Sequence, residues 1–289
     1  MLHFICNPIS GNGKASKAAD TIMTKLNDSD IPYEFHFSDE KGNATQIARE
    51  LTEKGYKDII VVGGDGTLHE VLNGLCDPKQ VNLGLIASGS GNDLGSFVGI
   101  PKDPIAALDI ILNGTPKPTD YLMCSGIRGI NVLGTGVDVD ILKRCYKSKI
   151  LKGKFKYMIS TLISVFLYKY PHATVTVDGK DTVHDCFIIS CANGRRFGGG
   201  IVIAPEAVID NGSIDFVLVN GMKWYHKPAA LLKLATGKIL DVKQTEFMHA
   251  STVRAVFDEP CDINIDGEIY SNVELDVSIV PGGLNMYRP

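Results

Sequence analysis

The stretch IIVVGGDGTLHEVLNGL, residues 59–75, constrains the fold of this chain more than any other part of the sequence. Its first four residues, 59–62, are apolar and β-branched without interruption, which is typical of a strand buried on both faces of a parallel sheet. The glycines that follow can adopt backbone angles closed to other residues, and they leave room for a bulky anion to approach the main chain. A strand, a glycine turn and a following helix together predict a phosphate site at a helix N-terminus.

The residues after this turn indicate how the helix begins. Thr67 and Glu70 have the spacing of a capping box, so we expect Thr67 to cap a helix whose apolar face starts at Leu68. Asp65 is unusual beside a phosphate site, because its carboxylate repels phosphate unless Mg²⁺ bridges the two groups or the carboxylate orients a reacting hydroxyl. Asp65 therefore indicates that this site carries out a chemical reaction and does not only bind phosphate. The alternative is a turn that serves packing alone, since GGDGT is neither a Walker A motif nor a Rossmann fingerprint.

Composition limits the class of protein. The chain has 289 residues, 44% of them hydrophobic, and a net charge of −4, so we expect two soluble domains and no nucleic-acid partner. The seven cysteines are odd in number and contain no CxxC pair, which predicts reduced side chains in a cytoplasmic protein. The seven histidines show no metal-ligand spacing, which argues against zinc. The start, MLHFICNPISGNG, lacks a signal-peptide pattern, and no apolar stretch is long enough to span a bilayer.

The first part of the chain alternates between short apolar strands and amphipathic helices. This alternation predicts a parallel sheet covered by helices on both faces, with ligands bound beyond the carboxyl ends of the strands. Three glycine-rich turns, 7–13, 63–66 and 88–95, fall at those ends, so we expect them to converge on one phosphate site. The expected strands cover 2–6, 33–37, 59–62 and 83–87, and the expected helices cover 14–26, 44–54, the stretch after Thr67, and 104–113.

After residues 115–120, TPKPTD, the sequence pattern changes to short β-branched segments, typical of strands, separated by Gly, Asn and Asp turns. The expected fold class is α/β plus all-β, with a three-layer N-terminal nucleotide-binding domain and a C-terminal β-sandwich-like domain. We place the first domain at 1–122 and the second at 123–275, and we expect the last strand, 276–289, to return to the first domain. The clearest strands of the second part are 173–177, 187–191 and 214–219, with more in 253–280.

Residues 143–171 are an exception to this β pattern. Their first part is basic and has no acidic residue, and the apolar stretch YMISTLISVFLYKYP follows directly. A cationic patch beside an apolar helix suits an anionic membrane surface, so we expect peripheral membrane contact here. The alternative is a helix that packs on its sheet with a solvated charged face. The basic residues are Lys143, Arg144, Lys147, Lys149, Lys152, Lys154 and Lys156.

With these segments laid out, the sequence resembles the diacylglycerol kinase catalytic family, especially its soluble bacterial lipid kinases, whose catalytic domain is shared by sphingosine and ceramide kinases. NAD kinases and phosphofructokinases also carry a GGDG turn, but the whole set of motifs in this order is specific. The resemblance implies an enzyme that uses ATP and Mg²⁺ to phosphorylate the hydroxyl of a lipid alcohol such as diacylglycerol. The motifs are NPISG at 7–11, GGDGTLHEVLNGL at 63–75, GSGNDLG at 89–95, GTGVDVDI at 134–141, FGGGIVIAP at 197–205 and DGE at 266–268.

The resemblance also implies roles for single residues. Glu268 would be the general base that takes the proton of the acceptor hydroxyl, with Asp266 beside it and Asp65 as the third catalytic residue. The DGE motif also reads as a simple hairpin turn, and both roles are compatible. The residues implied in nucleotide binding are Asn7, Pro8, Ser10, Gly11, Ser38, Gly63, Gly64, Asp65, Gly66, Thr67, Leu68, His69, Ser90 and Asn92.

Two magnesium sites are implied. Asp65, Asp93 and Asp120 would hold the catalytic ion and its waters, although Asp93 also suits a brace for its own loop and Asp120 a turn or cap. Relatives often bind a structural ion with an acidic residue where this chain has Asn211, so we expect weaker binding here. The carbonyl groups of Val208 and Ser213 would complete that second site. Further departures from the family pattern are His69 in place of asparagine and Ser90 in place of threonine.

Several alternatives stay open from the sequence. One is another GGDG kinase, such as a kinase acting on NAD, although the Asn92-Asp93 pair and the NPISG turn favour the lipid kinases. A second is a nucleotide-binding regulator without turnover, and a third is a membrane-surface module built on residues 143–171. Exposed sheet edges leave room for a homodimer. The acceptor lipid is set by the shape of a pocket, which the sequence does not specify.

Overall fold

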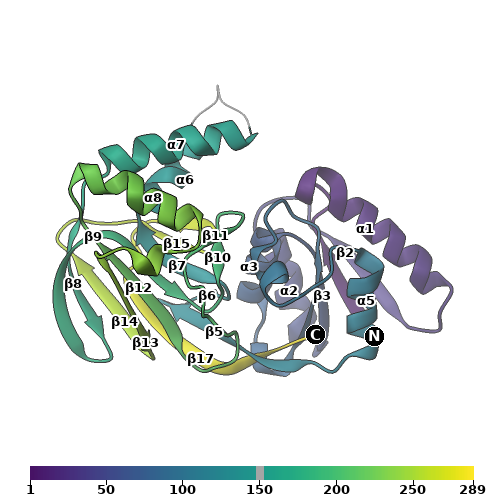
Figure 1. Cartoon of the computed structure of the whole chain (residues 1–289). Coiled ribbons are helices and arrows are strands. Elements are labelled where there is room, and N and C mark those ends of the chain that lie inside the picture. Colours follow the sequence, from purple (N-terminus) through teal and green to yellow (C-terminus); the bar gives the residue numbers. More distant parts are fainter. Residues whose placement is uncertain (148–152) are drawn as a thin grey trace.

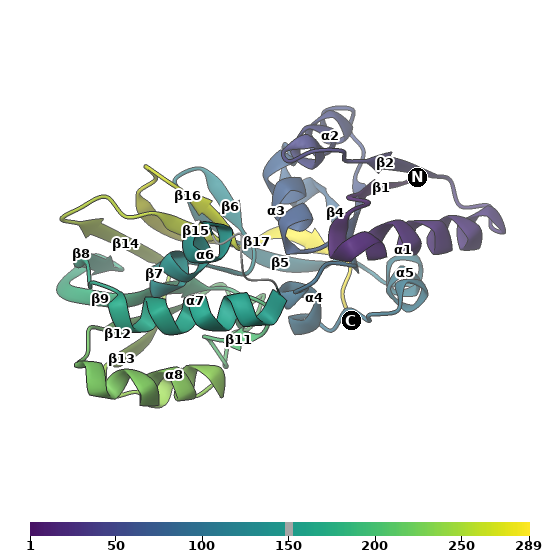
Figure 2. The same cartoon turned by 90° about the horizontal axis from the view of Figure 1, so that it is seen from above.

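The computed structural model describes residues 1–147 and 153–289. It consists of two lobes, one built from the N-terminal strands and helices and the other from β-strands with three helices on one side (Figure 1). The lobes are joined by two long strands, β5 (Lys117–Cys124) and β17 (Leu275–Met286), which lie side by side in antiparallel pairing (Figures 1 and 2). The N-terminal α/β lobe and the antiparallel C-terminal lobe confirm the expected fold class.

The N-terminal lobe is a parallel sheet in the order β4-β3-β1-β2. Alternate residues of β3 face opposite layers: Ile60 and Val62 pack with the core beneath α1 and α5, and Ile59 and Val61 pack with the core beneath α2 and α3. Burial on both faces explains the unbroken apolar run. The elements are β1 Leu2–Cys6, α1 Ser10–Asn27, β2 Tyr33–Phe37, α2 Asn43–Glu53, β3 Asp58–Gly63, α3 Asp65–Gly74, a 3₁₀ turn Pro78–Gln80, β4 Asn82–Ala87, α4 Asp93–Phe97 and α5 Pro104–Asn113.

Two helices begin earlier than expected. The residue before α3 is Gly64, and no side chain caps this helix, so the expectation that Thr67 is its cap is wrong. Asp65 takes the first helical position instead, where its negative charge is favourable at the N-terminus. α1 begins at Ser10, but Gly11, Asn12 and Gly13 adopt left-handed angles that interrupt it, so regular helix starts after the glycine turn.

The C-terminal lobe is a sandwich of antiparallel strands around an apolar core that includes Phe216, Val253 and Val277. Strand β9 belongs to both layers, since its first half pairs with β8 and its second half with β7 and β12. The strands are β6 Ile127–Gly129, β7 Val132–Gly136, β8 His172–Val177, β9 Lys180–Ala192, β10 Arg196–Phe197, β11 Ile201–Val202, β12 Ile214–Asn220, β13 Thr245–Ala250, β14 Thr252–Phe257, β15 Ile263–Ile265 and β16 Glu268–Tyr270.

Three helices cover the outer face of the β7-β9-β12 layer: α6 (Val137–Lys147), α7 (Gly153–Leu167) and α8 (Lys227–Ala235) (Figures 1 and 2). Short 3₁₀ turns at Trp224–His226 and Ile239–Asp241 flank α8. The basic part of the 143–171 stretch falls on α6, on α7 and on residues 148–152, and Lys149 and Lys152 lie outside the described residues. Lys143 forms an ion pair with Asp262, and Arg144 forms one with Asp140. Those two cations therefore already have acidic partners within the protein.

The last strand ties the lobes together. β17 pairs with β14 through residues 275–278, and its end pairs in parallel with β4, where Asn285 lies beside Asn82 and Met286 beside Leu83. The end of the chain therefore lies in the sheet of the N-terminal lobe. Because β5 and β17 cross between the lobes together, they fix the β15-β16 turn opposite the glycine turns of the first lobe.

Candidate active site

The three glycine turns of the N-terminal lobe pack directly against one another. A Cβ atom placed on Gly11 would lie 2.0 Å from the backbone oxygen of Ser88, and one on Gly64 would lie 2.9 Å from the Cα of Gly89. Gly11 also has a φ of 60°, which favours glycine. Only residues without a side chain permit this approach, so the glycines bring the loops after β1, β3 and β4 to one point at the carboxyl edge of the sheet.

A cavity of about 320 Å³, here called the phosphate cleft, opens at this point. The N-terminus of α3 contributes Gly64, Gly66 and Thr67, and its free N–H groups favour an anion. The Oδ1 atom of Asn7 is buried there without a hydrogen-bond partner among the described residues. The other lining residues are Ile9, Ser10, Ser38, Asp39, Glu40, Lys41, Glu70 and Glu268.

Some residues assigned to nucleotide binding do not line this cleft. Leu68 is part of the core, and His69 is buried between the lobes, where its Nε2 lies 2.7 Å from the hydroxyl of Tyr270. Asn92 braces its own loop by accepting from the N–H of Gly89 and donating to the Gly89 carbonyl. These residues shape the turns instead of facing the cleft. Pro8, Gly11, Gly63 and Ser90 are also absent from its lining.

A second cavity of about 230 Å³, the acceptor cleft, lies between the lobes and contains Asp65 and Asp93. The backbone N–H of Asp93 donates to Asp65 at 3.2 Å, and that of Gly199 donates to Asp93 at 2.8 Å. Burial raises the pKa of both carboxyl groups, and the charge of Asp93 raises that of Asp65 further. Two carboxylates that share a small buried cleft are poorly compensated, so the pair fits a divalent cation with oxygen ligands such as Mg²⁺.

Asp120 lies elsewhere. Its two carboxylate oxygens accept hydrogen bonds from the N–H groups of Gly212 at 2.6 Å and Gly282 at 2.7 Å, and it does not line the acceptor cleft. Asp120, on β5, thus ties Gly212 to Gly282 of β17 and is not among the residues that line the acceptor cleft with Asp65 and Asp93. The side-chain oxygen of Asn211 accepts from the N–H of Ser213 at 3.0 Å. An amide oxygen has two lone pairs, so one stays free, and the second magnesium site assigned to Asn211, Val208 and Ser213 stays a prediction.

Glu268 stands where the two clefts meet, since it lines both of them. It begins β16, and its Oε1 lies 3.8 Å from the position that a Cβ on Gly66 would occupy. Its Oε2 forms an ion pair with Lys41, 2.5 Å away. The side chain of Glu268 is 30% exposed, so a substrate can reach it. The carboxylate is thus placed to act on a group that lies between the clefts.

Asp266 has a different environment, although only one residue separates it from Glu268. Its carboxylate accepts from the N–H groups of Ile130, Asn131 and Val132 at 2.8, 2.9 and 3.2 Å and lies 3.4 Å from Nδ1 of His69. The turn is a β15-β16 hairpin, as the Asp-Gly pair indicates. With its oxygens occupied by backbone donors, Asp266 fixes the hairpin and thereby the position of Glu268.

This arrangement predicts a large effect of Asp266→Ala on stability. Three buried N–H groups would lose their acceptor, and we expect the free energy of unfolding to fall by about 2–4 kcal/mol. Urea denaturation followed by circular dichroism measures the change. Glu268→Gln in the same hairpin is the control, because its side chain pairs with Lys41 and has no comparable backbone bonds within the described part of the chain. A change of equal size in both variants would contradict the anchoring role.

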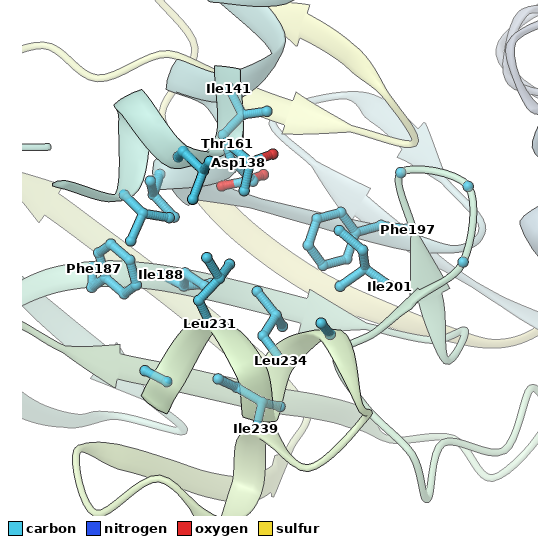
Figure 3. A pocket seen from close by; sticks show the side chains of 18 residues that line it. Asp138, Ile141, Thr161, Phe187, Ile188, Phe197, Ile201, Leu231, Leu234 and Ile239 are labelled. Atoms are coloured by element: carbon cyan, nitrogen blue, oxygen red, sulfur yellow. The ribbon is translucent and has the colours of Figure 1, made fainter. Parts of the chain in front are cut away.

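A third cavity, the apolar pocket, has a volume of about 740 Å³ and is larger than the two clefts (Figure 3). Helices α6, α7 and α8 and the 197–201 segment enclose it, and the side chains of Phe187, Leu231 and Leu234 face its interior (Figure 3). It shares Asp138, Phe197, Gly198 and Gly199 with the acceptor cleft. An elongated apolar molecule could therefore lie in this pocket with a polar end reaching Asp65 and Glu268.

Asp138 is a site residue that the sequence analysis missed. Its Oδ2 accepts from the side-chain amide of Asn264 at 3.1 Å, while its Oδ1 is buried with no partner among the described residues. Burial raises the pKa of this carboxyl group. A signal was present, because the GTGVDVDI motif places an aspartate between Val137 and Val139, which are both buried. The free oxygen at the junction of pocket and cleft is suited to hold a donor group of a ligand.

The raised pKa of Asp138 gives a pH-dependent prediction. Its protonated form stabilises the fold fully below the ordinary aspartate pKa of about 3.9, and this contribution is lost as the pH rises through the raised value. Asp138→Asn resembles the neutral form, so we expect a higher melting temperature than the wild type at neutral pH and a difference that shrinks on acidification. Calorimetry across this pH range measures both. A difference independent of pH would contradict the assignment.

Two models of protein families match consecutive parts of the chain. The model of the diacylglycerol kinase catalytic domain matches residues 1–124. The model described as the YegS C-terminal NAD kinase beta sandwich-like domain matches residues 131–288. The second model covers more than half of the chain.

Individual relatives match along most of their length. The chain is 28% identical to a diacylglycerol kinase of Mycobacterium tuberculosis, over 99% of this chain and 94% of that protein. It is 26% identical to a diacylglycerol kinase of Bacillus subtilis, over 98% of this chain and 93% of that protein. Among solved structures, one of a diacylglycerol kinase from Bacillus anthracis has a TM-score of 0.74 at 21% identity and covers 100% of this chain and 96% of that one. A second structure from that organism has a TM-score of 0.81 at 23% identity and covers 100% of this chain and 95% of that one. At these identities the structures show a common fold.

Proposed function

We propose, from the premise that this chain belongs to the diacylglycerol kinase catalytic-domain family, that it transfers the γ-phosphate of ATP to the hydroxyl group of a lipid alcohol such as diacylglycerol. The continuity of three cavities carries this proposal. The phosphate cleft meets the acceptor cleft at Gly66 and Glu268, and the acceptor cleft meets the apolar pocket at Asp138 and Phe197. A phosphate donor, a hydroxyl and an apolar chain thus each have a place along one path.

The phosphate cleft would hold the phosphates of ATP. The glycine turns allow the phosphate oxygens to reach backbone N–H groups, and the N-terminus of α3 adds a favourable dipole. Ser10 and Thr67 supply hydroxyl groups in the same cavity. Lys41 lines the same cleft and pairs with Glu268, so its ammonium group would lie near a bound phosphate.

Asp65 and Asp93 are the residues that would hold Mg²⁺. When bound, the ion neutralises charge on the phosphate groups, which is the main requirement of phosphoryl transfer. The protein itself fixes the two carboxylates, since backbone N–H groups of Asp93 and Gly199 hold them toward the acceptor cleft. The glycine turns keep this region free of side chains that would obstruct an in-line approach.

Glu268 would take the proton of the acceptor hydroxyl. The apolar pocket would hold the hydrocarbon part of the lipid, and the free oxygen of Asp138 would accept a hydrogen bond from the polar head group. Burial against apolar side chains provides affinity, and the few polar groups at the junction set the orientation. The hydroxyl would then lie between Glu268 and the phosphate cleft, which is the geometry that transfer requires.

The surface around α7 and α8 suits the membrane in which such a lipid is found. Among the described residues, apolar side chains are exposed on α7, on α8 and on the 3₁₀ turn before α8, including Leu167 and Trp224, which are 67% and 73% exposed. Lys227, at the start of α8, donates to the carbonyl of Phe166 near the end of α7, so these exposed side chains are neighbours. Residues 221–238 contain no acidic residue and four lysines, of which Lys227 alone is buried, and this charge favours anionic lipids. No helix among the described residues has the length and apolarity needed to cross a bilayer.

Replacing both Trp224 and Tyr225 by alanine is expected to weaken binding to vesicles that contain phosphatidylglycerol. Loss of two exposed aromatic rings should lower the partition coefficient about tenfold or more. Sedimentation with sucrose-loaded vesicles measures it. Phe37→Ala is the control, because Phe37 is an exposed aromatic residue of the other lobe. Equal binding by all three proteins would contradict a membrane contact at this surface.

The direct test of the function is transfer of radiolabelled γ-phosphate from MgATP to diacylglycerol, monoacylglycerol, sphingosine, undecaprenol and NAD. We expect label on a lipid alcohol and none with the Glu268→Gln variant. Label on NAD would favour an NAD kinase-like activity instead. ATP binding without transfer to any acceptor would favour a regulatory protein.

A further inference from the structure

A cluster of two histidines and a glutamate lies on the N-terminal lobe, away from the three cavities. Strands β1 and β2 pair in parallel with His3 beside Glu34 and Ile5 beside His36. Because side chains alternate along a strand, Glu34 and His36 share a face of β2, and that face meets His3. None of the three residues lines the phosphate cleft, the acceptor cleft or the apolar pocket.

The donor atoms of these side chains surround one point. The Nδ1 of His3 lies 3.2 Å from Nε2 of His36 and 3.6 Å from Oε2 of Glu34, and the last two atoms are 3.8 Å apart. Ligands of a tetrahedral zinc ion, each at about 2.0–2.1 Å from the metal, are separated by about 3.3 Å. The distances among these three donor atoms are therefore close to those among three ligands of a tetrahedral zinc ion.

Hydrogen bonding alone does not account for this arrangement. One proton can lie between His3 and His36, but the Glu34 oxygen is farther from either ring than a hydrogen bond allows. We propose that His3, Glu34 and His36 form a binding site for a borderline divalent cation of the Zn²⁺ class. The ion would join β1 to β2, the last strand in the sheet order on that side.

The surroundings suit such an ion. His3 is fully buried, and its Nδ1 faces both of the other donor atoms. Tyr56 packs on His3 with ring centroids 3.9 Å apart, which holds the orientation of the imidazole. Glu34 is half exposed and contributes negative charge, so an ion can approach from solvent and retain water as a further ligand.

The expected affinity is moderate. The second ring nitrogen of His3, Nε2, has no hydrogen-bond partner among the described residues, whereas strong metal ligands are usually held by such a bond. With three protein ligands and this missing support, we expect a dissociation constant on the order of a micromolar. The site is independent of the proposed kinase function, since it rests on the β1-β2 pairing alone.

Isothermal titration with ZnCl₂ on the full chain, in a buffer that does not chelate zinc, tests this proposal. We expect one equivalent to bind and the melting temperature to rise with zinc concentration. His36→Gln and Glu34→Gln should each weaken binding at least tenfold. His172→Gln should bind like the wild type, because His172 also faces a carboxylate, that of Asp185 at 2.9 Å, but forms no metal-ligand cluster among the described residues.

Cysteine is the competing zinc ligand, and Cys76 is exposed. Cys76→Ser should therefore retain the site, and the visible spectrum with Co²⁺ should show nitrogen and oxygen ligation without a thiolate charge-transfer band. Circular dichroism verifies that each variant is folded. Unchanged binding in His36→Gln, or binding lost in Cys76→Ser, would identify an adventitious ion only and overturn the proposal.

Discussion

Glu268→Gln is expected to lower the rate of phosphate transfer about 10²–10⁴-fold, the range that a general base contributes. Glu268 lines both the phosphate cleft and the acceptor cleft, and its Oε1 faces Gly66 at the start of α3. An amide of the same shape cannot take the proton of the hydroxyl. Because the loss concerns the chemical step, it should appear in kcat, while the affinity for ATP stays near that of the wild type.

The variant should fold normally. The Glu268 carboxylate forms an ion pair with Lys41, which is 78% exposed, and exposed pairs contribute about 0–1 kcal/mol. Glu70→Gln is the matched control, since Glu70 lines the phosphate cleft but not the acceptor cleft. A Glu268→Gln enzyme with more than half of the wild-type kcat, or an equal loss in Glu70→Gln, would remove Glu268 from the role of base.

Leu234→Trp is expected to reduce kcat/KM for a long-chain lipid at least tenfold. Leu234 projects from α8 into the apolar pocket, and a larger ring there would occupy space that the hydrocarbon chain requires (Figure 3). The residue is half-buried, so its neighbours can accommodate the ring better than at a core position. The loss should grow with chain length and be small for a short-chain diacylglycerol, while ATP binding is unaffected.

Leu232→Trp provides the matched control for this prediction. Leu232 lies two residues earlier on the same helix, is 66% exposed and does not line the pocket, so the same substitution adds no volume there. Steady-state rates with a series of chain lengths compare the two variants. If both lose activity equally, or if Leu234→Trp loses the same factor for every chain length, the pocket does not hold the lipid chain.

The sequence predicted the elements of the N-terminal lobe well. The uninterrupted run at 59–62 is buried on both faces of the sheet, and 33–37 and 104–113 match β2 and α5 at both ends. Such patterns are set by neighbouring residues, because a strand or helix buries side chains at fixed intervals. The predicted start of α3 was wrong. The capping-box spacing of Thr67 and Glu70 indicated a cap at Thr67, whereas the glycine turn already allows the helix to begin at Asp65.

The candidate site was predicted in part. The motifs brought Asp65, Asp93 and Glu268 into consideration, and the structure places these three around one cleft. Asp266 was grouped with them by its position in the DGE motif, yet the backbone of residues 130–132 occupies its carboxylate. Asp138 was overlooked, because an aspartate near the start of a helix is ordinary in sequence and its unpaired oxygen becomes evident only in the folded lobe.

By itself, the sequence determined the two kinds of lobe, the glycine turns after the strands and the family. Periodicity, turn chemistry and motif order are properties of residues close together in the chain, so they can be read without a structure. Only the tertiary structure decided which distant side chains meet. His3 and His36 show no ligand spacing in sequence, and the parallel register of β1 and β2 brings their nitrogens to 3.2 Å. Strand register and the crossing of β5 and β17 between the lobes set such distances, and these depend on the packing of the whole chain.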